Sequence, residues 1–399
     1  MTPALPYVTL ALSGALLLRM GQLRREGALA LGAAALSWLA LAPLALWVAL
    51  PEGTTLARAA LASALAVALL ARDREDVRQS EAALKLAWVL GAAFALTWAG
   101  GSLLALAAGT GVTAEQWPAL ALQLDPYALW GAALSLTLLA GLVLLGGAPF
   151  HFWLADVLHG AHAWLAPLVV AALQTAGAAL LLRRLDGVAG FPAGAALAGG
   201  LLTMSAAIAL VAGAATLATQ RRPERRVGTL ASLQGALLLC ALVAGRADAA
   251  LLASWGAHMA LALTGAGALA RFLTVSGDAA GAPPALFRRH PISGALGLYA
   301  LFSLAGVPGT PGMSLWLDAA RALAATRHPG LLAALVFAWI VAFTAVVDEA
   351  RRAFAAPTEL AAPERAVPWA TRAALWCAAA GLAAMLAAAA LPAGLALLR

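Results

Sequence analysis

Residues 148–156 read Ala-Pro-Phe-His-Phe-Trp-Leu-Ala-Asp and lie inside an apolar run that extends from residue 128 to residue 158. A helix needs about 20 apolar residues to cross a bilayer, so this run is too long for one straight span. Gly146, Gly147 and Pro149 interrupt it. Because proline removes a backbone donor and clashes with the preceding turn, the interruption frees carbonyl groups at membrane depth. The sequence therefore predicts a broken membrane helix whose freed groups are covered by protein or by trapped water.

A second apolar run, residues 291–325, is also too long for one span. It is interrupted by two prolines and two glycines, namely Pro308, Gly309, Pro311 and Gly312. Two broken helices, one in each half of a chain, are typical of transporters, in which such breaks line the transport site.

The composition of the whole chain is that of a membrane protein. Of its 399 residues, 63% are apolar and only 11% are charged, whereas soluble domains are about half apolar and a quarter charged. We expect an all-α, polytopic membrane helix bundle of about twelve spans, near residues 3–20, 27–50, 57–71, 83–108, 128–158, 163–183, 190–218, 227–244, 250–273, 291–325, 330–352 and 367–398. We divide it into N-terminal helices (1–56), a core with both broken helices (57–355) and a C-terminal helix (356–399).

The basic residues indicate the orientation of the chain rather than a nucleic-acid partner. The formal charge is +7, but the arginines stand in short clusters between apolar runs, as membrane topology requires. Most clusters fall on one side of the alternating spans: Arg19 with Arg24 and Arg25, residues 72–78, residues 221–226, Arg288 with Arg289, and Arg351 with Arg352. Arg183 and Arg184 fall on the other side. The positive-inside rule predicts a multi-pass protein of the cell membrane, surrounded by lipids, with both termini outside the cytoplasm.

No cofactor or metal site is legible in the sequence. Cys240 and Cys377 lie within apolar segments and are expected to be inert packing thiols. Cysteine and histidine show no metal-ligand spacing, and no glycine-rich phosphate loop follows a strand pattern.

Ionisable groups beside the first break are the strongest candidates for a functional site, because such groups are costly at membrane depth. Four of them follow one another closely: His151, Asp156, His159 and His162. Histidine titrates near neutral pH, so the set suits proton transfer. The alternative is an amphipathic turn at the cytoplasmic interface, with its polar atoms in water and Trp153 anchored at the headgroups. Spacing alone leaves both interpretations open.

Further polar residues lie in the later spans. Gln174, Gln234 and His258 are each able to bond a neighbouring helix or to take part in a proton path. Asp318, a further proton-path candidate, is expected to pair with Arg321 on one helix face. At the end of a later span, Asp348, Glu349, Arg351 and Arg352 are expected to form a solvated charge cluster.

Three stretches carry a resemblance to a known family. Residues 148–156 resemble the APFHFW-x-x-D signature of the antiporter-like, proton-translocating membrane subunits of respiratory complex I, whose family includes cation/proton antiporter and membrane-bound hydrogenase subunits. Residues 303–312 look like the break in the second half of these proteins, and residues 81–85 resemble the E-A-A-L-K start of a span in the N-type subunit. The resemblance covers about residues 57–355. It implies two inverted repeats that each contain a broken helix, and other membrane subunits of a redox or ion-translocating complex as partners.

The chain departs from this family at the residues that carry charge. The resemblance implies buried lysines at positions occupied here by Leu144, Gln174 and Trp316, a histidine at Gln234, and a buried glutamate within the uncharged stretch 61–65. A buried lysine can pass a proton along hydrated side chains, but leucine and tryptophan cannot hold one. The usual central relay is therefore interrupted.

The sequence thus predicts an antiporter-like subunit of a complex I-related assembly, degenerate in that its role is structural or its proton path is altered. Such a subunit would have no redox site or active site of its own. The alternative is a stand-alone proton or ion transporter or channel with its site at the two breaks. An intramembrane enzyme is the least favoured class, because neither a nucleophile nor a metal set is legible.

Overall fold

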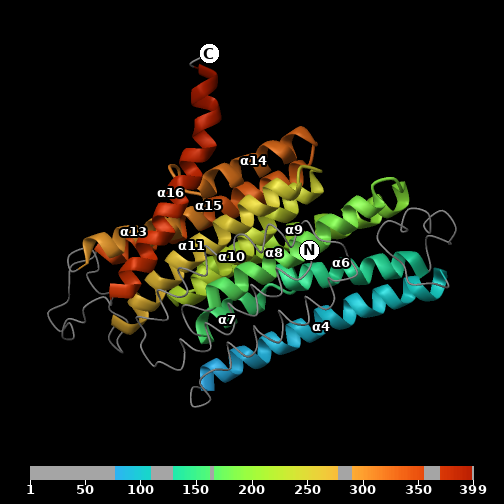
Figure 1. Ribbon diagram of the computed structural model, residues 1–399, viewed down its shortest axis with the longest axis horizontal. Helices are drawn as coiled ribbons and strands as arrows, with labels where there is room; N and C mark the ends of the chain where they lie inside the picture. The colour runs from blue at the N-terminus through green and yellow to red at the C-terminus, as the bar shows by residue number, and fades with distance from the viewer. Residues whose placement is uncertain (1–76, 109–128, 162–165, 277–289, 355–368, 398–399) are drawn as a thin grey trace, which may run out of the picture.

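The structure is a computed structural model that describes residues 77–108, 129–161, 166–276, 290–354 and 369–397 (Figure 1). The predicted spans 3–20, 27–50 and 57–71, the N-terminal helices expected over 1–56 and the candidate His162 lie outside these ranges.

Within the described ranges the chain forms eleven helices and no strand. They are α4 (Val77–Ala108), α6 (Gly131–Leu145), α7 (Phe152–Gly160), α8 (Ala166–Val188), α9 (Pro192–Thr219), α10 (Pro223–Val243), α11 (Ala249–Ser276), α13 (Pro291–Leu304), α14 (Pro311–Ala325), α15 (Pro329–Phe354) and α16 (Trp369–Leu397). By length and composition, α4, α9, α10, α11 and α15 are each able to cross a membrane. The all-α membrane bundle is confirmed, whereas the number of twelve spans stays a prediction.

Each of the two overlong apolar runs is a pair of helices in the structure. The first run is divided into α6 and α7, and Gly146 ends α6 in the left-handed conformation at φ 71°, which glycine adopts without steric cost. The second run is divided into α13 and α14, with Gly309 between them at φ 84° and Pro311 as the first residue of α14. Proline suits that position because the first turn has no hydrogen-bond partner for its N–H group.

Helix α4 begins several residues before the predicted span 83–108. Its first turns are polar, and the i,i+4 pair Glu81–Lys85 joins two of them at 2.8 Å. Such a pair favours helix in a stretch whose polarity places it at the membrane surface rather than in the hydrocarbon.

Helix α10 lies at the centre of the bundle, and almost every residue along it is buried. It packs against α7, α9, α11 and α14, while α4 lies beside α6 at one edge and α16 packs against α11 and α13 (Figure 1). At Gly228 a Cβ atom would lie 2.4 Å from the Cα atom of Ala155. The backbones of α10 and α7 therefore touch, which places the second half of the first broken helix directly on the central helix.

Candidate functional site

The carbonyl groups at the first break have donors within the protein. Three of them accept hydrogen bonds from buried side chains: Val143 O from Trp153 Nε1 at 3.0 Å, Leu145 O from Gln174 Nε2 at 2.9 Å, and Ala148 O from Ser205 Oγ at 2.8 Å. These donors come from three other helices, α7, α8 and α9. The remaining turn is closed by the backbone, where the Phe150 N–H group donates to Gly147 O at 2.7 Å. Few backbone carbonyl groups at the break are therefore left without a hydrogen-bond donor.

Gln174 connects the first break to the central helix. Its Nε2 atom also donates to Ala231 O on α10 at 3.0 Å, and its side chain is fully buried. One amide group thus joins the end of α6 to α8 and α10.

The second break is satisfied in the same way. Gln234 Nε2 on α10 donates to Leu304 O at 2.6 Å, and Trp339 Nε1 on α15 donates to Gly306 O at 3.1 Å. One residue before Leu304, Ser303 Oγ lies 2.9 Å from His258 Nε2 and accepts the Gly312 N–H group at 3.2 Å. Residues 174, 234, 258 and 303 therefore form a buried polar belt that links the two breaks through α10.

The polar belt contains no carboxylate, lysine or arginine. At the other two positions where the resemblance implies lysine, Leu144 is buried and Trp316 is fully buried, with its ring stacked on Trp339 at 5.7 Å between centroids. Among the described residues, the buried aspartate, glutamate, lysine and arginine side chains are those of Glu224, Arg226 and Glu349. All three lie at the ends of α10 and α15, away from the two breaks.

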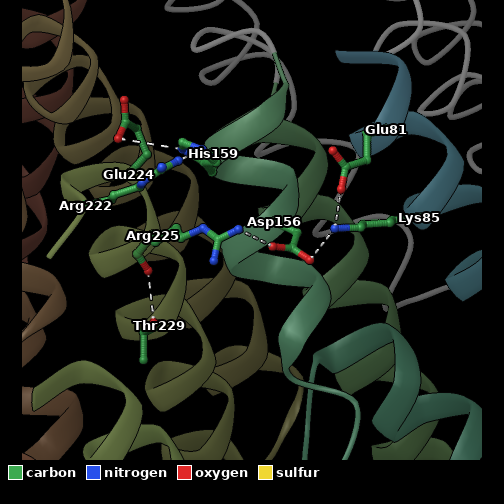
Figure 2. A network of polar contacts seen from close by, with 8 residues as sticks. All are labelled: Glu81, Lys85, Asp156, His159, Arg222, Glu224, Arg225 and Thr229. Carbon is green, nitrogen blue, oxygen red and sulfur yellow. Dashed lines mark hydrogen bonds and ion pairs between the residues drawn. The ribbon is translucent and has the colours of Figure 1, made fainter. Parts of the chain in front are cut away.

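A network of charges lies at the end of the bundle where α7 meets α4 and α10 (Figure 2). The carboxylate of Asp156 on α7 is 2.9 Å from Lys85 Nζ on α4 and 3.1 Å from Arg225 Nη2 on α10. Lys85, the only lysine in the chain, also contacts Glu81. Asp156 thus joins α7 to α4 and α10 by ion pairs and forms a structural contact between these three helices.

His159 lies on the same face of α7, one turn farther on. Its Nε2 atom is 2.7 Å from Arg222 Nη1, and its Nδ1 atom is 3.9 Å from Glu224 Oε2 (Figure 2). It therefore faces a cation and an anion from the start of α10.

The prediction of a solvated charge cluster at the end of α15 is wrong for Glu349. This side chain is buried and pairs with Arg226 Nη1 on α10 at 2.5 Å, while Asp348 stays half-exposed and pairs with Arg352 at 3.0 Å. Arg226 also donates through Nε to Gln220 O at 2.7 Å. The difference arises because successive helical residues point in directions about 100° apart, so neighbours in sequence have separate environments.

The remaining candidates are not brought into one site. His151 is half-buried between α6 and α7, and its Nδ1 atom has no hydrogen-bond partner. Asp318 is exposed and forms the local pair with Arg321 at 3.4 Å. In the described ranges of the chain, no three histidine, cysteine or acidic side chains lie close enough to hold a metal ion.

Sequence reasoning missed several residues of the charged network. The sequence indicates Lys85 only as part of the motif at 81–85. It indicates the arginines of residues 221–226 only as markers of membrane topology. The available signal was that Pro223, Glu224 and Arg225 open a span directly after a basic pair, which brings charges of both signs to one helix start.

Comparison with known proteins gives partial sequence matches. The chain is 33% identical over 238 residues to NADH-quinone oxidoreductase subunit N of Geobacillus kaustophilus, a match that covers 56% of this chain and 46% of that protein. It is 32% identical over 242 residues to NAD(P)H-quinone oxidoreductase subunit 2 of Prochlorococcus marinus, covering 59% and 45%. The matches thus span less than half the length of these curated relatives. No family model matches the chain.

Solved structures extend the likeness to nearly the whole fold. A chain of respiratory complex I from Thermus thermophilus has a TM-score of 0.66 at 23% identity, over 97% of this chain and 98% of that chain. A chain of the Mrp complex from Dietzia sp. has a TM-score of 0.67 at 15% identity, over 97% and 89%. A chain of an archaeal membrane-bound sulfane sulfur reductase has a TM-score of 0.72 at 16% identity, over 90% and 63%. At these identities the likeness concerns the fold, which the chain shares with membrane chains of these three complexes.

Proposed function

We propose that the chain is an antiporter-like membrane subunit of a complex I-related, ion-translocating assembly, and that it serves there as a structural subunit without a charge relay of its own. The curated relatives are named as subunits of quinone oxidoreductases, and the solved neighbours belong to multi-subunit membrane complexes. We accordingly propose other membrane subunits of such a complex as its partners. We also retain the division into residues 1–56, a core of 57–355 that carries both breaks, and residues 356–399.

The structural role is proposed because protein side chains donate hydrogen bonds to the carbonyl groups at the two helix breaks. In transporters, carbonyls freed by a helix break act as ligands for the coupling ion. Here Gln174 and Gln234 hold the carbonyls of Leu145 and Leu304. A glutamine amide can donate and accept hydrogen bonds but cannot carry a proton as a charge. The same side chains that replace ionisable groups of the family therefore fix the breaks.

We propose that the end of the bundle with Glu81, Asp156 and the start of α10 faces the cytoplasm, with both termini on the opposite side. The described arginines support this proposal. Residues 221–226 and the pair Arg351 and Arg352 lie at the same end of the bundle, because Arg226 at the start of α10 contacts Glu349 near the end of α15.

The orientation can be tested with one exposed cysteine. In a chain in which Cys240 and Cys377 are replaced by alanine, Arg221→Cys should react with a membrane-impermeant maleimide in inverted membrane vesicles and stay unlabelled in intact cells. Arg221 is exposed and suits such a label. Labelling in intact cells would reverse the proposed orientation.

Purification from native membranes in a mild detergent, followed by mass spectrometry, tests the proposed assembly. We expect homologous membrane subunits and hydrophilic redox subunits to accompany the chain in constant ratio, because its fold is that of a subunit. An unrelated membrane protein with the same affinity tag provides the control for non-specific capture. A lone chain or a homo-oligomer would contradict the proposal and favour the stand-alone transporter, which ion flux in proteoliposomes would then measure.

A further inference from the structure

The contact between His159 and Arg222 fixes the hydrogen position on the histidine ring. Arg222 Nη1 lies 2.7 Å from His159 Nε2. A guanidinium group has donors and no acceptor, so Nε2 must accept this bond. The hydrogen of the neutral ring is therefore on Nδ1.

The Nδ1 atom points at a buried carboxylate. It has no hydrogen-bond partner, and Glu224 Oε2 is 3.9 Å away, beyond hydrogen-bond distance. The Glu224 side chain is only 9% exposed. Both residues line a small pocket, together with Leu158, Ala161, Pro167, Val227 and Gly267. A buried donor and a buried acceptor thus face each other beside this pocket.

The charges around the ring come from three elements. Helix α10 and the residue before it contribute Arg222, Glu224 and Arg225, helix α4 contributes Arg78, and α7 itself carries Asp156, which is held by Lys85 and Arg225. From α8 and α11, the described residues at the pocket are the uncharged Pro167 and Gly267.

His159 stands in the last turn of α7, at the charged end of the bundle and outside the apolar spans. Burial lowers the pKa of His159, and the three arginines act in the same direction, whereas Glu224 raises it. Burial and the arginines thus favour the neutral ring in the arrangement of side chains that Figure 2 draws.

We propose that His159 and Glu224 form a proton-binding site at this end of the bundle, in which one proton taken up from water by Nε2 breaks the contact with Arg222 and moves the ring onto Glu224. The incoming proton occupies the lone pair that Arg222 used, so the two cations repel each other. The imidazolium then donates its Nδ1–H group to the Glu224 carboxylate. Because α7 is the second half of the first broken helix, acidification changes how this half is held on α10.

The site requires neither a partner subunit nor conduction across the bilayer, so it stands apart from the proposed assembly. The chain has six histidines, which makes nuclear magnetic resonance of ¹⁵N-histidine-labelled full chain in lipid nanodiscs practicable. His159→Gln identifies the signal by its loss. At pH 8 the His159 ring should show a protonated Nδ1 and an unprotonated Nε2.

Two variants should move the protonation midpoint of His159 in opposite directions. Arg222→Gln removes an opposing cation and should raise the midpoint, whereas Glu224→Gln removes the attracting anion and should lower it, each by about half a pH unit or more. The control is Arg221→Gln, an exposed arginine next to Arg222 that does not act on the ring, and it should leave the midpoint unchanged.

A hydrogen on Nε2 at pH 8 would overturn the proposal. So would equal midpoints in wild type and in both variants, or shifts of the same sign. If His159→Gln does not fold, Arg222→Gln and Glu224→Gln still identify the His159 signal, because the proposal requires one histidine signal that these two variants move in opposite directions. The absence of such a signal would also overturn the proposal.

Discussion

Replacement of Glu349 by leucine should lower the free energy of unfolding by about 3–5 kcal/mol, because it leaves the guanidinium of Arg226 buried without its main partner. Both side chains are at most 10% exposed, and Arg226 Nη1 donates to Glu349 Oε2 at 2.5 Å. The pair joins the central helix α10 to α15, so its loss should loosen contacts well beyond the ion pair itself. Unfolding monitored by steric trapping in bicelles would measure the change, and thermal melting in detergent would show it as a lower midpoint.

A matched control lies one residue earlier. Asp348→Asn alters a carboxylate that is half-exposed and 3.4 Å from Arg226 Nη2, so solvent should reduce its effect to about 1 kcal/mol or less. The double variant Arg226→Met with Glu349→Leu should recover most of the stability, because two apolar side chains remove both buried charges at once. If Asp348→Asn costs as much as Glu349→Leu, or if the double variant is no more stable than the single one, the buried pair is not the main contact between these helices.

The sequence alone was sufficient to predict the positions of the described helices and of both breaks. Runs of apolar residues have a length set by the bilayer, and glycine and proline mark the places where a helix cannot continue. Residues 128–158 were therefore expected to be one interrupted span, and the structure has α6 and α7 there. The predicted span 83–108 begins later than α4, because a hydropathy pattern marks only the apolar residues that lie in the hydrocarbon. The helix itself also includes the polar turn with Glu81.

The partners of polar side chains across helices could not be predicted in the same way. Arg226 and Glu349 are 123 positions apart, and nothing in the sequence distinguishes Glu349 from its half-exposed neighbour Asp348. The rotation of each helix about its axis decides which of two adjacent acids is buried, and that rotation depends on the packing of the whole bundle.

The glutamines show a different limit. The sequence indicated that Gln174 and Gln234 stand where the family has ionisable side chains, and it indicated that an amide can bond a neighbouring helix. It did not indicate that the acceptors are the carbonyls next to the two breaks. The residue type alone shows that a charge is missing at these positions. Only the three-dimensional structure shows that a hydrogen bond to a break carbonyl takes its place.

Gln174→Leu should accordingly destabilise the chain, because it removes the side-chain donor from two buried carbonyls, Leu145 O and Ala231 O. Ala231 lies inside α10 and keeps its backbone donor, whereas Leu145 at the end of α6 is followed four residues later by Pro149, which has no N–H group. Since one unsatisfied buried acceptor costs about 1–3 kcal/mol, we expect a loss of about 1–3 kcal/mol in the free energy of unfolding. Leucine has a similar volume, which limits any contribution from a cavity. The same unfolding measurement in bicelles would detect the change.

The neighbouring Thr175→Val is the matched control, since Thr175 is equally buried but donates only to Ala171 O within its own helix. It should cost about 1 kcal/mol or less, because that carbonyl keeps its backbone donor. If Gln174→Leu costs no more than this control, water must replace the amide at the first break. The freed carbonyls would then be open to water and ions, as they are in transporters with broken helices, and the structural role proposed here would give way to transport through the breaks.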